Sequence, residues 1–181
     1  MTPAYRAARA YITVGSNIDP MENIPAAAGM LRCTPGVRLL ASSRFWRTGP
    51  VGRTDQPDFV NGAWAIRTEL DIPTLQSHLR DVEDRLGRRR SADRNAPRTI
   101  DLDLVLYGTT MDPALRLPHP DLARPFVYGP VMELLATDPD ADAIRRLVVA
   151  HLGSQAPPPA KADRPGVYLP DLTALLRDML V

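Results

Sequence analysis

The chain is poor in cysteine, in lysine and in long apolar runs, and each scarcity narrows the class of protein. Cys33 is the single cysteine, which excludes an internal disulfide and fits a reducing compartment. No apolar stretch approaches the ~18 residues that span a bilayer. Residues 1–10 lack the apolar centre of a signal peptide. We therefore expect a cytoplasmic protein with no membrane contact.

The composition is that of a globular protein with a core of its own. Of the 181 residues, 44% are hydrophobic and 24% are charged. The formal net charge of +1 argues against a general binder of polyanions. Lys161 is the only lysine among 22 basic residues, so arginine supplies nearly all of the positive charge. The charge is unevenly distributed, since six of these basic residues lie in one short segment, residues 85–98.

The order of the expected elements indicates the fold class. Strand-like patterns occupy residues 10–17, 37–48, 59–70 and 99–107. A helix is expected after the first strand and another after the third. The order β-α-β-β-α-β is the ferredoxin-like arrangement, with a mainly antiparallel four-stranded sheet backed by two helices. The sequence thus predicts an α/β (α+β) fold.

Start and stop signals place the two helices. Asp19 is a possible N-cap, with Pro20 at the first helical position and Glu22 placed for a capping box. The second helix is expected to end at Gly87, a natural C-cap. Its apolar residues recur at helical spacing and share one face: Leu75, Leu79, Val82 and Leu86.

The chain divides into three parts by composition. We expect one domain over residues 1–150, a proline-rich linker over residues 151–165 and a C-terminal tail over residues 166–181. The tail reads as a short amphipathic helix. Its leucines otherwise lack cover, so we expect it to pack on the domain as a helical extension.

Two aspartates within the last predicted strand need a cation. Asp101 and Asp103 point to the same face, roughly 7 Å apart. Two such carboxylates repel each other and resist desolvation. Arginine could neutralise them, or a hard divalent cation such as magnesium, which takes carboxylate and phosphate oxygens. The alternative is a solvated strand face with surface ion pairs, and the spacing alone does not separate the two.

The segment before these aspartates favours phosphate chemistry. Magnesium could bridge phosphate oxygens to the aspartates while guanidinium groups hold the remaining charge. A solvated basic loop or a nucleic-acid patch is the alternative. No P-loop motif occurs, so a nucleotide would be held in another way. The basic residues of this segment are Arg85, Arg88, Arg89, Arg90, Arg94 and Arg98.

Two further stretches could contribute to a site. "DQPDFVNGAW" places Phe59 and Asn61 on one strand face, where a ring and an amide could bind a flat heterocycle. Those two residues alone favour a simpler interpretation, a core aromatic beside an incidental asparagine. "LPHPDLARPF" holds His119 in a proline-rich turn, with Arg124 and Phe126 close behind.

Together these stretches resemble the 6-hydroxymethyl-7,8-dihydropterin pyrophosphokinase family of folate biosynthesis. The motifs that carry the resemblance are "VGSN", "DQPDFVN", "RNAPRTIDLDLVLYG" and "LPHP", in the family's order, over roughly residues 11–139. The resemblance implies the ferredoxin-like fold. It also implies transfer of the terminal pyrophosphoryl group of ATP to the pterin's hydroxymethyl oxygen, with release of AMP.

The resemblance also implies roles for individual residues. Asp101 and Asp103 match the acidic pair that binds two magnesium ions, and Arg88 and Arg98 match catalytic arginines that contact phosphates. The matches to the pterin pocket are Thr48, Pro50, Phe59, Asn61 and Phe126. The matches on the ATP side are Glu83, Arg90, Arg94, Leu104, His119 and Arg124.

The expected partners are the two small-molecule substrates, with neither nucleic acid nor membrane. We expect a monomer, with possible contact to other enzymes of the folate pathway. No residue stands out as a general base, and Asp103 is the nearest possible proton acceptor. Two alternatives stay open: an RNA-binding module on a ferredoxin-like sheet, and another magnesium- and ATP-dependent transferase of the same fold.

Overall fold

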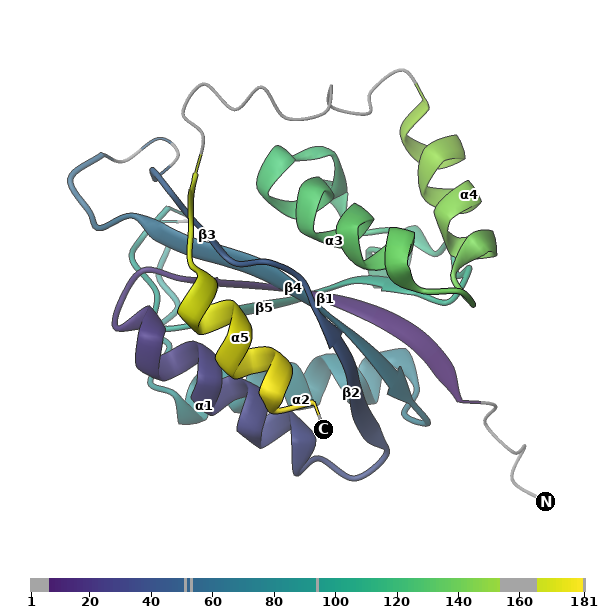
Figure 1. Cartoon of the computed structure of the whole chain (residues 1–181), viewed down its shortest axis with the longest axis horizontal. Coiled ribbons are helices and arrows are strands. Elements are labelled where there is room, and N and C mark those ends of the chain that lie inside the picture. The colour runs from purple at the N-terminus through teal and green to yellow at the C-terminus, as the bar shows by residue number, and fades with distance from the viewer. Residues whose placement is uncertain (1–6, 51, 53, 94, 154–165, 181) are drawn as a thin grey trace.

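A computed structural model describes residues 7–50, 52, 54–93, 95–153 and 166–180 (Figure 1). The strands are β1 Ala8–Ser16, β2 Val37–Ser42, β3 Trp46–Thr48, β4 Phe59–Thr68, β5 Asp101–Tyr107 and β6 Val167–Tyr168. The helices are α1 Pro20–Arg32, α2 Ile72–Arg85, α3 Pro125–Thr137, α4 Asp142–Leu152 and α5 Pro170–Asp178. Two 3-10 turns, Pro113–Leu115 and Pro120–Ala123, follow β5.

The strands form one antiparallel sheet in the order β5-β1-β4-β3-β6, and β2 also pairs with β4. The predicted mixed α/β class and antiparallel sheet are confirmed. The predicted number of four strands is wrong, because the sheet has six strands among the described residues alone. β6 from the tail adds one strand, and the expected strand over residues 37–48 is divided into β2 and β3.

The division between β2 and β3 has a local cause. Ser43 stays bound to β4, since its amide donates to the Ala63 carbonyl at 2.9 Å and its hydroxyl accepts from the Ala63 amide at 2.8 Å. Phe45 then turns into the core and is fully buried. Its ring lies against Gly62, and any side chain at position 62 would collide with the ring. The strand resumes at Trp46.

Gly62 should therefore not tolerate a side chain. A Cβ atom at this position would lie 2.6 Å from the nearest atom of the Phe45 ring. We expect Gly62→Ala to lower the free energy of unfolding by about 1–3 kcal/mol, the usual cost of overpacking a core. Urea unfolding would measure it. Gly129→Ala is the matched control, because no atom lies within 4 Å of its added Cβ. Equal stability of the two variants would contradict the prediction.

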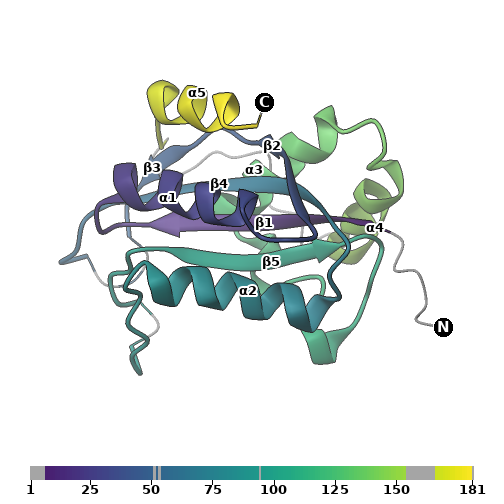
Figure 2. The same cartoon turned by 90° about the horizontal axis from the view of Figure 1, so that it is seen from below.

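Helices cover both faces of the sheet (Figures 1 and 2). One face carries α1, α2 and α5 over a core cluster that contains Ile12, Trp64, Leu75 and Leu104. The other face carries α3 and α4 over a cluster that contains Tyr11, Val105 and Leu134. Both faces of the central strands are thus buried, as their nearly continuous apolar sequences require.

A bulge in β5 changes which face its last residues occupy. The pairing with β1 shifts between Tyr11, which faces Leu106, and Ile12, which faces Leu104, so Val105 is the extra residue. Strict alternation predicts Leu106 on the face of Leu104 and Tyr107 on the face of Asp103. Both assignments are wrong beyond the bulge, since Leu106 packs under α3 and α4 and Tyr107 packs on the α1 and α2 side.

The helix starts agree with the prediction only in part. α1 begins at Pro20, but the predicted capping box is absent, because Asp19 adopts φ 45° and makes no side-chain capping bond. Its carbonyl instead accepts from the Glu22 amide at 3.1 Å. α2 is capped by Asp71, whose carboxylate accepts from the Thr74 amide at 2.8 Å. Gly87, with φ 77°, follows α2 as expected.

The C-terminal tail packs on the body of the protein, as predicted from its leucines. α5 contacts α1 and β2, and Leu172 and Leu176 are buried in the core cluster beneath them. Within the predicted linker over residues 151–165, His151 and Leu152 belong to α4, and residues 154–165 lie outside the described residues. In the part of the chain that is described, no helix is both long enough and apolar enough to cross a membrane.

Candidate active site

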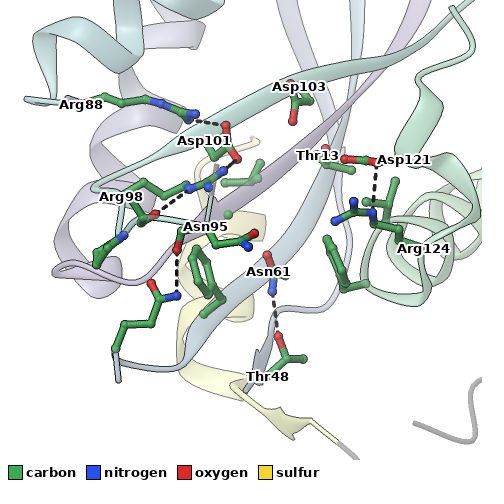
Figure 3. Close-up of a pocket in the computed structure, with 18 of the residues that line it drawn as sticks. Thr13, Thr48, Asn61, Arg88, Asn95, Arg98, Asp101, Asp103, Asp121 and Arg124 are labelled. Carbon is green, nitrogen blue, oxygen red and sulfur yellow. Dashed lines mark hydrogen bonds and ion pairs between the residues drawn. The ribbon is translucent and has the colours of Figure 1, made fainter. Parts of the chain in front are cut away.

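A cavity of about 790 Å³ opens beside one end of β1, β4 and β5 (Figure 3). It is lined by residues of these strands, by residues 88–91, 93 and 95–98 of the arginine-rich loop, and by residues 116, 119–121, 124, 126 and 127 around the start of α3. The structure brings together at its wall most of the residues predicted from the sequence. They are Thr48, Phe59, Asn61, Arg88, Arg90, Arg98, Asp101, Asp103, His119, Arg124 and Phe126.

Among the described residues, three predicted site residues do not line the cavity. Pro50 follows β3 just outside it, and Leu104 is buried in the core beneath α1 and α2. Glu83 lies behind the wall and contacts the cavity only through arginine side chains. The fourth, Arg94, lies outside the described residues.

Asp101 is neutralised by two arginines from the neighbouring loop (Figure 3). Arg88 donates to one carboxylate oxygen and Arg98 donates to the other. The sequence left arginine or a divalent cation as alternatives for this charge, and the structure shows arginine at Asp101. Burial opposes the charge on Arg88, but Asp101 and Glu83 outweigh it and raise the pKa of the guanidinium above its usual value.

Glu83 is a buried carboxylate that holds the base of the arginine loop. It accepts from Arg88 at 2.8 Å, from Arg90 at 2.5 Å and from the Leu102 amide at 2.8 Å. Its exposed fraction is 4%. Burial raises the pKa of Glu83 to about 7, while the Leu102 amide and the two arginines act in the opposite direction. Glu83 therefore connects α2 with the arginine-rich loop and with the edge of β5 that faces away from β1.

In the described part of the chain, Asp103 has no arginine partner as close as those of Asp101. Its nearest ion-pair partner is His119, whose Nε2 lies 3.8 Å from the carboxylate. Partial burial and repulsion by Asp101 raise the pKa of Asp103, against the influence of His119, Arg88 and Arg116. Since 47% of its side chain is exposed, against 21% for Asp101, Asp103 is the more accessible of the two carboxylates.

His119 is positioned by the free edge of β5. Its amide donates to the Val105 carbonyl at 3.0 Å, and its Nδ1 accepts from the Asp121 amide at 3.2 Å. In the neutral ring the proton must then sit on Nε2, the nitrogen that faces Asp103. His119 is 6% exposed, so its orientation is set by packing as well as by these bonds.

A second part of the cavity contains an amide and two aromatic rings. The Asn61 amide donates to the Thr48 hydroxyl at 2.8 Å (Figure 3). Its oxygen lies close to Gly15, where an added Cβ would stand 3.0 Å away. Phe59 and Phe126 line the cavity, and a guanidinium group lies over each ring: Arg98 over Phe59 and Arg124 over Phe126. The Arg98 guanidinium carbon is 5.7 Å from the centre of the Phe59 ring. A flat polar heterocycle suits this combination of rings and amide.

Asn17, a residue not predicted from the sequence to belong to the site, links its own segment to two others around the cavity. It is 3% exposed. Its side chain donates to Gln56 at 2.9 Å and to the Pro57 carbonyl at 3.1 Å, and it accepts from the Arg98 amide at 2.8 Å. Gln56 in turn donates to the Asn95 carbonyl at 2.8 Å. Asn17 belongs to the motif "VGSN", and the occurrence of this motif in the family was the sequence signal that could have identified Asn17 as a site residue.

Arg116 was also missed, because it stands alone among apolar residues in "PALRLPHP". It adopts φ 58° after the first 3-10 turn and lines the cavity. No sequence pattern predicts that this turn lines the same cavity as the arginine-rich loop, since the two lie on different segments. Arg116 and Arg124 both add positive charge to the cavity wall, and Figure 3 shows Arg124 across the cavity from Arg88.

The protein has an α/β fold in which two carboxylates of β5 lie next to an arginine-rich loop in one cavity. This arrangement is typical of transferases that act on phosphate groups. The family model described as 7,8-dihydro-6-hydroxymethylpterin-pyrophosphokinase matches residues 11–136. The chain belongs to this family. The resemblance read from its motifs over residues 11–139 is thereby confirmed.

Curated relatives give the same result. A 2-amino-4-hydroxy-6-hydroxymethyldihydropteridine pyrophosphokinase of Haemophilus influenzae is 38% identical over 146 residues, 77% of this chain and 90% of the relative. The protein of that name from Methylorubrum extorquens is 42% identical over 130 residues, 70% of this chain and 82% of the relative. A mitochondrial folate synthesis bifunctional protein of Pisum sativum is 35% identical over 137 residues, 74% of this chain but 26% of the relative.

Proposed function

We propose that this chain transfers the pyrophosphoryl group of ATP to the hydroxymethyl oxygen of 6-hydroxymethyl-7,8-dihydropterin, giving the pterin diphosphate and AMP. The observation that supports it best is the division of one cavity into two parts. Arginines and carboxylates suited to a polyphosphate occupy one part, and an amide with aromatic rings occupies the other. Family membership favours this reaction over the RNA-binding alternative and over a transferase with another acceptor.

The site chemistry fits magnesium. Asp103 presents a half-exposed carboxylate, its pKa raised by partial burial and by repulsion from Asp101, and a cation there would relieve that repulsion. In the described part of the chain no group of three or more acidic, histidine or cysteine side chains could hold a metal. Two carboxylates completed by phosphate oxygens and water are, however, the usual magnesium environment. Asp101 and Asp103 are the ligands that we propose, with two ions as the expected number.

Bound magnesium would supply Lewis-acid polarisation of the phosphoryl oxygens. The chain's own residues would do the positioning. Arg88 and Arg98 are held by Asp101 in the structure and could exchange this partner for phosphate oxygens when the nucleotide enters. Glu83 would keep Arg88 and Arg90 near their places during that exchange. His119 can donate from Nε2 to a phosphate oxygen near Asp103.

The pterin would occupy the part of the cavity around Asn61. Thr48 fixes the orientation of the amide by accepting one of its hydrogens, so the other hydrogen and the oxygen remain for the heterocycle edge. Phe59 and Phe126 would stack on the ring faces. The pterin hydroxymethyl group would then point towards Asp103, which remains our expected proton acceptor.

The direct test of this function is formation of AMP. The protein, ATP, magnesium and 6-hydroxymethyl-7,8-dihydropterin should give AMP and pterin diphosphate. Neither should form without the pterin, and a chelator should stop the reaction. AMP formed at the same rate without the pterin would exclude this acceptor. Tight RNA binding with no ATP binding would restore the RNA-binding alternative.

We also propose a cytoplasmic monomer that uses small-molecule substrates. Contact with other folate-synthesis enzymes is a further proposal, supported by the Pisum sativum relative, whose name describes a bifunctional protein. The match covers only 26% of that relative, so most of its chain lies outside the part that resembles this protein.

The assignment of Asn61 can be tested by its selectivity. We expect Asn61→Ala to raise KM for the pterin by about tenfold or more, because the heterocycle edge would lose at least one hydrogen bond to the amide. KM for ATP should change by less than about twofold. Initial rates with each substrate varied in turn would measure both. Gln76→Ala, at a surface amide bound to the Leu115 carbonyl, is the control. Equal losses for both substrates would place the pterin elsewhere.

A further inference from the structure

The C-terminal tail reaches the wall of the proposed pterin pocket through β3. This strand has only three residues, and it carries Thr48, the hydrogen-bond partner of Asn61. β3 pairs with β4 on one side and with β6 of the tail on the other. The family match ends at residue 136, so the tail lies beyond the range in which the family motifs assign functional residues.

The tail binds both backbone groups of Phe45, immediately before β3. The Phe45 amide donates to the Thr173 hydroxyl at 3.1 Å, and the Phe45 carbonyl accepts from the Leu169 amide at 2.9 Å. Thr173 is 1% exposed, and its hydroxyl also donates to the Leu169 carbonyl at 2.9 Å. Removing this hydroxyl would leave a buried backbone amide without its partner. The tail therefore holds the chain where β2 ends and β3 begins.

The tail also packs closely along β3 itself. Trp46 and Tyr168 are paired, with ring centroids 5.3 Å apart. At Gly166 an added Cβ would lie 2.9 Å from the Arg47 carbonyl oxygen and 3.1 Å from the Thr48 methyl group. There is no space between the tail and the residue that orients Asn61. A change at Gly166 must therefore move either the tail or Thr48.

We propose that the segment from Gly166 to Thr173 is a positioning element of the pterin pocket. It holds β3 from the side opposite β4 and so fixes the Thr48 hydroxyl against Asn61. This inference rests on the proposed function, since it takes the pocket around Asn61 to be the pterin site. A three-residue strand paired on one side only is weakly held, and pairing on both sides limits its movement.

If the tail positions Thr48, loosening the tail should affect binding of the pterin but not of ATP. Small errors in the position of a binding group far from the reacting atoms can cost large factors in rate. On the polyphosphate side, Arg88 and Arg90 are held by Glu83 of α2. A loosened tail should therefore weaken binding of the pterin and leave that of ATP nearly unchanged. A tail that served only overall stability would affect neither substrate selectively.

Two full-length variants test this selectivity. Gly166→Ala pushes the tail against Arg47 and Thr48, and Thr173→Val removes the hydroxyl that binds Phe45 at nearly constant volume. We expect each to raise KM for the pterin about tenfold, the scale of one misplaced hydrogen bond, with KM for ATP within about twofold. Leu175→Ala is the control on the same helix, because Leu175 is 47% exposed. Thermal melting would show that each variant is folded.

A double-mutant cycle separates this inference from the proposed function. If the tail acts through Thr48, Gly166→Ala should add little to the effect of Thr48→Ala. Fully additive effects on KM for the pterin would overturn the inference. An effect of Thr48→Ala, with none from Gly166→Ala and Thr173→Val, would overturn the inference alone. No effect of Thr48→Ala or Asn61→Ala would instead overturn the pterin site itself.

Discussion

Replacing Asp103 by alanine is expected to lower turnover by several orders of magnitude while the fold survives. Asp103 is half exposed to the cavity, and among the described residues its one ion-pair contact is His119 at 3.8 Å, so its removal disturbs little of the protein itself. The loss should come from the missing magnesium ligand and from phosphate charge that is no longer neutralised. Single-turnover formation of AMP would measure the effect.

The isosteric Asp103→Asn variant keeps the shape and removes the charge, so it should be impaired nearly as much. Asp101→Ala should also lose several orders of magnitude, but with an added cost, because Arg88 and Arg98 lose their shared partner. Asp142→Asn is a suitable control, an exposed acid of α4 paired with Arg145. Turnover near that of the unmodified protein in either alanine variant would contradict the metal assignment.

Alanine at Arg88 or Arg98 is expected to lower turnover by about a hundredfold or more, the usual loss for a group that stabilises transition-state charge. Both guanidinium groups line the cavity and are already gathered on Asp101, so they are placed to move onto phosphate oxygens. Arg98→Lys should recover only part of the activity, because an ammonium group lacks the planar fork of donors. The measurement is kcat at saturating substrates.

Arg145→Ala provides the control for this second prediction. Arg145 is 46% exposed on α4 and pairs with Asp142, away from the residues that line the cavity. It should show unchanged kcat. If Arg88→Ala raised only KM for ATP and left kcat intact, the arginine would bind the ground state without stabilising the transition state.

The secondary structure could be predicted closely where local signals agree. The helical spacing of Leu75, Leu79 and Val82 predicts the buried face of α2, and all three are buried. The predicted capping box at Asp19 failed, since the left-handed backbone at this residue turns the side chain away from the helix amides. The N-cap of α2 is Asp71, and Pro73 follows it in the first turn of the helix. The hydrophobic pattern alone does not predict this start.

The bulge in β5 shows where alternation stops being informative. Side chains alternate only while the pairing with the neighbouring strand keeps its register, and one extra residue at Val105 reverses the pattern. Asp101 and Asp103 come before the bulge, so their shared face was predicted correctly. Leu106 and Tyr107 come after it, and their faces were not. A bulge depends on two strands that are distant in the sequence.

The sequence by itself determined the chemistry of the site. Acidic residues two apart on a strand, an arginine-rich loop before them and an asparagine two residues after a phenylalanine are local patterns, and spacing along the chain suffices to read them. Tertiary structure decided the partners: Asp101 with two arginines, Asp103 with His119, Asn17 with two distant segments, and Phe45 and Thr48 with the C-terminal tail. These contacts join residues up to 128 positions apart, as in Phe45 with Thr173, and such pairings depend on how the sheet and its helices pack as a whole.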